Sequence, residues 1–167
     1  QAAGAAGHDY FLDFDRPQSI GRVKGFYGNI GVLARAYAYI LRMGAEGLRR
    51  ASGDAVLNAN YLRARLRDTY QVPYDRVCMH EFVASAARQK AAGVMARDIA
   101  KRILDFGMHA PTVYFPLVVP EALMIEPTET EGLSELDAFV AVMLAIDEEC
   151  RDSPATVLAA PHNTPVQ

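Results

Sequence analysis

The fold is decided by the stretch Thr112-Val113-Tyr114-Phe115-Pro116-Leu117-Val118-Val119-Pro120-Glu121-Ala122-Leu123-Met124-Ile125. Residues 112–117 and 122–125 are rich in strand-forming side chains, and Pro120 separates the two runs. The connection at 118–121 suits antiparallel strands, because parallel strands need a crossover of about a dozen residues or more. The sequence therefore predicts a β-hairpin at 112–125.

Helical patterns flank this hairpin on both sides. Residues 96–106 are amphipathic, and Gly107 stands where a helix often ends in a left-handed residue. After the hairpin, Ser134-Glu135-Leu136-Asp137 has the spacing of a capping box, with Ser134 as the N-cap. Apolar side chains at helical spacing then predict a last helix through Leu136, Phe139, Val140, Met143 and Ile146.

Two helices and one strand are expected before residue 96. The first helix covers about 29–43, and a second continues to about Asp68, with a break and a new N-cap at Ser52-Gly53-Asp54. Residues 77–83 are short, rich in strand formers and preceded by Pro73, which favours a strand.

The resulting order is helix, helix, strand, helix, strand, strand, helix. This order predicts an α/β (α+β) domain of two layers, in which a short, mainly antiparallel sheet packs with helices. We expect an extended arm over residues 1–27, the α/β domain over 28–152 and an irregular tail over 153–167. The arm is rich in glycine and aromatic residues, and it needs a surface to lie on.

Composition excludes several classes of protein. The chain has 167 residues, 51% of them hydrophobic, which is enough for one core. Its net charge is −3 and its arginines are dispersed, so we expect no nucleic-acid partner. No apolar run approaches the roughly 20 residues that span a bilayer, so we expect no membrane partner. Cys78 and Cys150 match no metal spacing and are typical of reduced thiols in the cytoplasm. The start, Gln1–Gly7, has no periodicity and no initiator methionine, as expected of a piece of a longer protein.

Six segments of the sequence, in order and spacing, resemble one family over about residues 8–165. The segments are Ser19-Ile20-Gly21-Arg22-Val23 with Phe26-Tyr27-Gly28-Asn29, Met43-Gly44-Ala45-Glu46-Gly47-Leu48, Leu57-Asn58-Ala59-Asn60-Tyr61-Leu62, His80-Glu81-Phe82, Asp105-Phe106-Gly107-Met108-His109-Ala110-Pro111-Thr112 and Glu126-Pro127-Thr128-Glu129. The resemblance is to the glycine cleavage system P-protein family (glycine dehydrogenase, decarboxylating). The segment 19–23 and the ending near 161–166 are similar to the second subunit of its two-subunit form.

The resemblance implies the small C-terminal domain of a fold-type I pyridoxal-phosphate enzyme. Such an enzyme decarboxylates glycine on pyridoxal phosphate and passes the aminomethyl group to the lipoyl arm of the H-protein. It also implies the first subunit of glycine dehydrogenase as a partner, in an oligomer. The cofactor lysine of the family follows a histidine, and none of Lys24, Lys90 and Lys101 does. We therefore expect no catalytic residue in this chain, and no pyridoxal phosphate bound to it alone.

The arm is the candidate for contact with the cofactor. Its glycines precede the first helix, whose free N–H groups suit a phosphate, and Arg22 adds a permanently charged donor. Glycines in such places are more often simple turn residues. With the resemblance, Ser19, Arg22, Tyr27 and Gly28 become candidate cofactor-binding residues.

The substrate channel has four candidates, which are His80, Glu126, Thr128 and Glu129. On the expected strand, His80 and Glu81 point to opposite faces, so they form no acid–base pair. His80 is then either a hydrogen-bonded core or interface histidine, or a polar contact at the channel rim. Residues 126–129 either serve as turn and capping residues or organise the mouth of the active site.

Other polar residues have simpler interpretations. His109 is expected to anchor a loop, and no metal site is expected, because the four histidines share no ligand spacing. Five arginines suit a solvated helix face or an acidic surface of the H-protein, namely Arg49, Arg50, Arg63, Arg65 and Arg67. Two rival interpretations stay open: the small domain of another fold-type I enzyme, such as an aminotransferase, and a non-catalytic module that binds a partner subunit.

Overall fold

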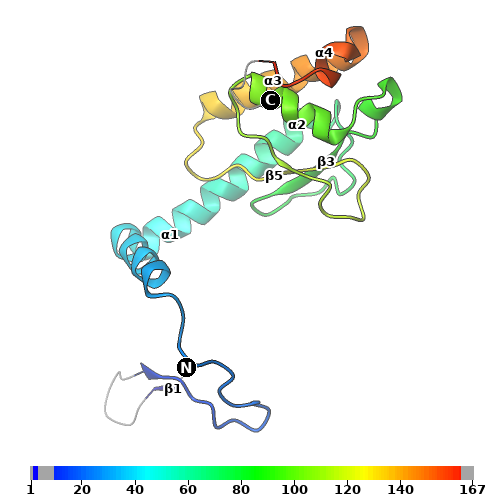
Figure 1. Ribbon diagram of the computed structural model, residues 1–167. Coiled ribbons are helices and arrows are strands. Elements are labelled where there is room, and N and C mark those ends of the chain that lie inside the picture. Colours follow the sequence, from blue (N-terminus) through cyan, green and yellow to red (C-terminus); the bar gives the residue numbers. More distant parts are fainter. Residues whose placement is uncertain (1, 4–9, 163–167) are drawn as a thin grey trace. The chain divides into compact units, whose positions relative to one another are not determined.

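A computed structural model describes residues 2–3 and 10–162 of the chain (Figure 1). By their internal contacts, the residues divide into two compact units, unit 1 over Gln1–Gly44 and unit 2 over Ala45–Gln167. We describe each unit by itself.

The described part of unit 1 contains two paired strands, a loop and the first part of a long helix. Strands β1 (Ala2–Ala3) and β2 (Tyr10–Phe11) pair antiparallel, and turns connect β2 to helix α1 (Ile30–Leu66). The side chain of Asn29 accepts a hydrogen bond from the backbone N–H of Gly31 at 3.0 Å, so Asn29 caps the helix. The predicted helix start near residue 29 is confirmed.

Helix α1 is kinked at Gly44, which has φ 62° and ψ −177°. Only glycine adopts this conformation without strain, so the helical backbone is interrupted at this residue. The break predicted at residues 52–54 is wrong. Ser52 lies inside continuous helix, and its hydroxyl donates to the carbonyl of Leu48 at 3.1 Å.

Unit 2 contains a three-stranded antiparallel sheet in the order β3-β5-β4. Its strands are β3 (Phe82–Ser85), β4 (Thr112–Val113) and β5 (Ala122–Ile125). β4 and β5 form the predicted hairpin, which is confirmed. β4 is shorter than the predicted 112–117, because Tyr114 takes a positive φ of 59°, and a residue with that backbone cannot continue a strand.

The strand predicted over residues 77–83 also differs from the structure. β3 begins only at Phe82. The backbone N–H and C=O of Cys78 bond to the side chain of Asn60 on α1 instead of to a neighbouring strand. Residues 77–81 are therefore loop.

The helices of unit 2 follow the predicted order with two corrections. They are α2 (Ala96–Asp105) and α3 (Leu133–Asp152), together with the short 3-10 helix η1 (Gln89–Ala92). α3 is capped by Gly132, so Ser134 lies inside its first turn and the predicted capping box is wrong. Pro154–Leu158 form a short helix, α4, in the segment expected to be irregular. Gly107 has φ 74° just beyond α2, as predicted.

One hydrophobic core joins the sheet to the helices of unit 2. Phe82, Leu123 and Ile125 of the sheet pack into the same cluster as buried side chains of α1, α2, α3 and α4. The helices cover the sheet as a second layer (Figure 1), so the predicted two-layer α/β class is confirmed. Tyr70 is fully buried in this core, where its hydroxyl donates to the carbonyl of Met143 at 2.9 Å.

Candidate functional site

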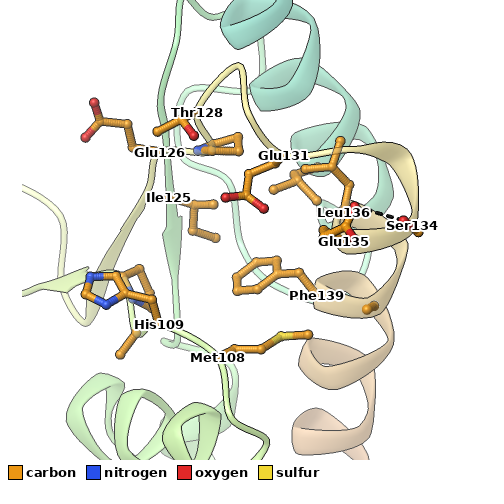
Figure 2. A pocket seen from close by; sticks show the side chains of 15 residues that line it. Met108, His109, Ile125, Glu126, Thr128, Glu131, Ser134, Glu135, Leu136 and Phe139 are labelled. Atoms are coloured by element: carbon orange, nitrogen blue, oxygen red, sulfur yellow. Dashed lines mark hydrogen bonds between the residues drawn. The ribbon is translucent and has the colours of Figure 1, made fainter.

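A cavity of about 560 Å³ opens in unit 2 where β5 ends. Its walls come from the end of β5, the loop before β4 and the start of α3, as Figure 2 shows. Apolar side chains form much of the wall, namely Leu62, Met108, Ile125, Leu136 and Phe139.

Three carboxylates give this cavity its charge. Glu126, Glu131 and Glu135 line it, and its lining in the described residues includes no lysine or arginine. In Figure 2 the carboxylate of Glu131 points into the cavity, whereas that of Glu126 points away from it. The hydrogen bond from Ser134, and then those from backbone N–H groups, lower the pKa of Glu135. A cavity with this lining favours a neutral or cationic group over a phosphate.

Asn58 of α1 fixes the loop that follows β5. Its side-chain amide donates to the carbonyl of Thr128 at 2.9 Å and to that of Glu131 at 3.0 Å. These two bonds hold the segment 126–131 against the helix. The turn that carries Glu126 and Thr128 is thus positioned by a side chain about 70 residues earlier in the chain.

Asn60, two residues further along α1, fixes the loop before β3. Its amide donates to the carbonyl of Cys78 at 2.8 Å, and its oxygen accepts from the Cys78 N–H at 3.0 Å. The segment that carries His80 and Glu81 starts from this anchor. Sequence reasoning predicted no role for either asparagine, although two amides near the buried face of a helix were a signal that loops bond there.

The structure brings His80, Glu81 and Glu126 together. Phe82 pairs with Ile125 in the sheet, so the residues just outside this pair are neighbours. His80 Nε2 lies 3.6 Å from a carboxylate oxygen of Glu126, and ligand atoms of all three residues lie within 4.8 Å of one another. The expectation that His80 and Glu81 lie on a strand and diverge is therefore wrong. His80 and Glu126 are both about half exposed, and the cluster has the geometry of a surface ion pair.

Of the other two residues predicted for the substrate channel, Thr128 and Glu129, only Thr128 lines the cavity. Thr128 lines the cavity, and its hydroxyl bonds to that of Thr130 at 2.6 Å. Glu129 is half-buried and is not part of the lining. His109, predicted as a loop anchor, is exposed and lines the cavity on the side of β4.

The arm residues make contacts with one another. The guanidinium of Arg22 donates to the carbonyls of Lys24 (2.9 Å) and Gly25 (2.7 Å) and lies 5.0 Å from the ring centre of Tyr27. The hydroxyl of Ser19 accepts from the N–H of Gly21 at 3.0 Å. Gly28 has φ 132°, which favours glycine. These bonds close turns and leave further N–H donors on the Arg22 guanidinium.

Lys90 does not suit a Schiff base with a cofactor. Lys90 bonds to the buried carboxylate of Glu121 at 2.7 Å, and this hydrogen bond raises its pKa. Formation of a Schiff base requires the neutral amine, which a raised pKa disfavours. Lys101 is exposed on α2, and Lys24 is exposed on the arm.

Three arginines expected on a solvated face make ion pairs within unit 2. Arg63 pairs with Asp75, and only 12% of its side chain is exposed. Arg67 also approaches Asp75, while Arg65 pairs with Asp137. These arginines therefore hold the turn after α1 and the start of α3, which corrects the expectation of a purely solvated face.

A sheet of three antiparallel strands, a covering layer of helices and an acidic cavity define a small two-layer α/β domain. Residues 51–165 match the sequence model of the family described as glycine dehydrogenase, C-terminal domain. The chain belongs to this family, and the resemblance seen in the sequence is confirmed.

Curated relatives cover nearly the whole chain. A probable glycine dehydrogenase (decarboxylating) subunit 2 of Exiguobacterium sibiricum is 60% identical over 95% of this chain and 32% of its own length. Proteins of the same description from Caldanaerobacter subterraneus subsp. tengcongensis and Bacillus velezensis are 56% and 59% identical, over 95% and 93% of this chain and 33% and 32% of their own lengths. The chain thus spans about a third of the length of the curated relatives it matches. Within residues 2–3 and 10–162, no helix has both the length and the apolar character needed to cross a bilayer.

Proposed function

We propose that this chain is the C-terminal part of a glycine dehydrogenase (decarboxylating) subunit 2 and acts within that enzyme in the cytoplasm. The enzyme removes the carboxyl group of glycine as carbon dioxide. It passes the aminomethyl group to the lipoyl arm of the H-protein. The first subunit is its partner, in an oligomer.

One observation supports this proposal most strongly. Identity of 56–60% over at least 93% of the chain is shared with proteins described as this subunit. The same similarity argues against an aminotransferase, which has a comparable small domain. Fold alone would not separate the two, because one fold hosts many activities.

Pyridoxal phosphate would act as the electron sink when glycine loses its carboxyl group. The described residues do not form a complete site for it. The cavity of unit 2 is acidic, Lys90 is held by Glu121, and the arm residues bond to each other. We therefore propose that Arg22, with Ser19, Tyr27 and Gly28, contributes to a cofactor site whose other residues come from outside this chain. His80, Glu126, Thr128 and Glu129 would border the path of the substrate.

The activity is tested with the full-length protein that carries this chain. It is combined with the first subunit, pyridoxal phosphate and lipoylated H-protein, and carboxyl-labelled glycine is added. Release of labelled carbon dioxide that requires the H-protein is the expected result. Transfer of the amino group to a 2-oxo acid, without loss of the carboxyl group, would reject the proposal in favour of an aminotransferase.

The role of the arm is tested with Arg22→Ala in the same assembly. If Arg22 meets the phosphate or the substrate carboxylate, a charge-assisted bond of about 1.5–3 kcal/mol is lost, and affinity falls about ten- to a hundredfold. Arg22→Lys should recover only part of this, since an ammonium lacks the planar fork. Arg16→Ala is the matched control, because Arg16 lies on the same arm and pairs with Asp13 at 2.7 Å. Unchanged affinity with a lower melting temperature would show that Arg22 only closes the turn of the arm.

A further inference from the structure

Unit 1 exposes a run of large apolar side chains. Ile20, Val23, Phe26 and Tyr27 of the arm are 62–87% exposed, although a loop in water rarely carries so many. The first half of α1 continues the pattern, with six more such residues that are 50–80% exposed, namely Ile30, Val32, Leu33, Tyr37, Ile40 and Leu41.

The distribution of these side chains around the helix shows how much of the helix surface needs to be buried. At about 100° per residue, apolar positions occupy roughly two thirds of the circumference of residues 30–43. The charged residues of this half helix are Arg35 and Arg42, which are seven apart and share one narrow stripe. A single flat surface covers one side of a helix, whereas this helix needs protein on most of its sides.

The family match and the structure divide the chain near the same place. The match to the C-terminal domain family begins at residue 51, and unit 2 begins at Ala45. The relatives, however, match about 95% of the chain, so they share most of the residues before 51 as well. Unit 1 is thus common to these proteins without being part of their C-terminal domain.

We infer that residues 20–43 form a buried element of a second, larger domain, which is built by the part of the full-length polypeptide outside this chain. This chain spans about a third of the relatives, so two thirds of their length is available to surround the helix. Gly44 is then the joint between the two domains, because its non-helical backbone conformation interrupts α1 at the boundary of the two units.

This inference extends the proposed function in one respect, and only that respect rests on the proposed function. The arm residues Arg22 and Tyr27 would be anchored in the domain that holds the cofactor. The anchoring itself depends only on family membership and on the exposed apolar side chains.

Hydrogen exchange measured by mass spectrometry tests the inference, on the full-length protein and on this chain alone. Backbone amides of residues 33–43 should exchange about a hundredfold more slowly in the full-length protein, since they open only with the larger domain. Equal exchange in the two samples would overturn the inference. Strong protection in this chain alone would also overturn it, because unit 2 or a second copy would then be the cover.

A substitution adds a second measurement. Ile40→Asp should lower the melting temperature of the full-length protein by about 5 °C or more, because a carboxylate is then buried. The same substitution in this chain alone is the matched control, and its melting temperature should stay unchanged. If the full-length variant does not fold, exchange in the unmodified protein still decides. Neither measurement depends on enzymatic activity, so failure here and failure of the proposed reaction are distinguishable.

Discussion

Units 1 and 2 contain the same kinds of apolar residue in opposite surroundings. Ile40 of unit 1 is 50% exposed, whereas Ile103 of unit 2 is fully buried, and both lie in helices. A helical pattern fixes which side of a helix is apolar. It does not supply the surface that buries that side, and unit 2 contains such a surface while unit 1 requires one.

The polar contacts of the two units differ in the same way. In unit 1 the side-chain hydrogen bonds of residues 13–31 join residues two or three apart, such as Arg22 and Gly25. In unit 2 they join residues as far apart as Asn58 and Thr128, or Tyr70 and Met143. Local bonds close turns, but bonds across 70 residues require a folded core. The stability of this chain therefore resides in unit 2.

The sharpest test of this difference makes one substitution in both units. Ile103→Ala removes a fully buried side chain and should lower the free energy of unfolding of this chain by about 2–5 kcal/mol. Ile40→Ala should change it by less than about 0.5 kcal/mol, because the side chain is already in water. Urea unfolding measures both. Equal losses would mean that unit 1 is packed in the isolated chain, and the comparison would be wrong.

The next largest effect is expected at the ion pair between the buried Glu121 and the exposed Lys90. Glu121 is held by Lys90 at 2.7 Å and by the N–H of Ala96 at 3.0 Å. Burial alone would raise the pKa of Glu121, but the bonds from Lys90 and Ala96 outweigh it, and the pKa lies below its ordinary value of 4.5. Glu121→Gln should cost about 1–2 kcal/mol at pH 7. Arg22→Ala in unit 1 of the isolated chain should cost less than about 0.5 kcal/mol.

The pH dependence of Glu121→Gln follows from the sign of this shift. A lowered pKa in the folded state contributes stability above pH 4.5, and this contribution is lost as pH falls through the folded value. The difference between wild type and variant should therefore shrink from pH 7 towards pH 3 in thermal melts. A difference that is constant over this range would show that the charge of Glu121 contributes nothing.

The long-range bonds of unit 2 predict a smaller and local effect. Asn58→Ala removes two bonds to the loop after β5 and should cost about 1 kcal/mol. Amide exchange should quicken at residues 126–131 and stay unchanged at 77–79. Asn60→Ala is the matched control, with the opposite pattern, because its bonds go to Cys78. Identical exchange patterns in both variants would contradict separate anchoring of the two loops.

The smallest effect is expected at the start of α3. Ser134 lies inside the first turn, since Gly132 is the N-cap, and its hydroxyl bonds to Glu135 on the surface. Ser134→Ala should change the free energy of unfolding, measured in urea, by less than about 0.5 kcal/mol. A loss of about 1 kcal/mol or more in the free energy of unfolding would show that Ser134 caps the helix.

By itself, the sequence determined the α/β class, the hairpin, the last two long helices, the turn at Gly107 and the family. Each of these depends on residues close together in the chain, through periodicity, turn chemistry or an ordered set of motifs. The same reasoning failed at residues 77–81, which have strand-forming composition, and at Ser134, which has capping spacing. At residues 77–81, bonds of Cys78 to Asn60, 18 residues earlier, replaced strand pairing. At the start of α3, the helix begins after Gly132 and not at Ser134.

Only the tertiary structure decided how the site is assembled. The register that pairs Phe82 with Ile125 brings His80 and Glu81 to Glu126, and Asn58 holds the loop that carries Thr128. A sequence pattern shows which side chains can bond, but not which distant backbone they will meet. That choice follows from the packing of the core, because a bond between residues about 70 apart forms only where the core has already brought them within 3 Å.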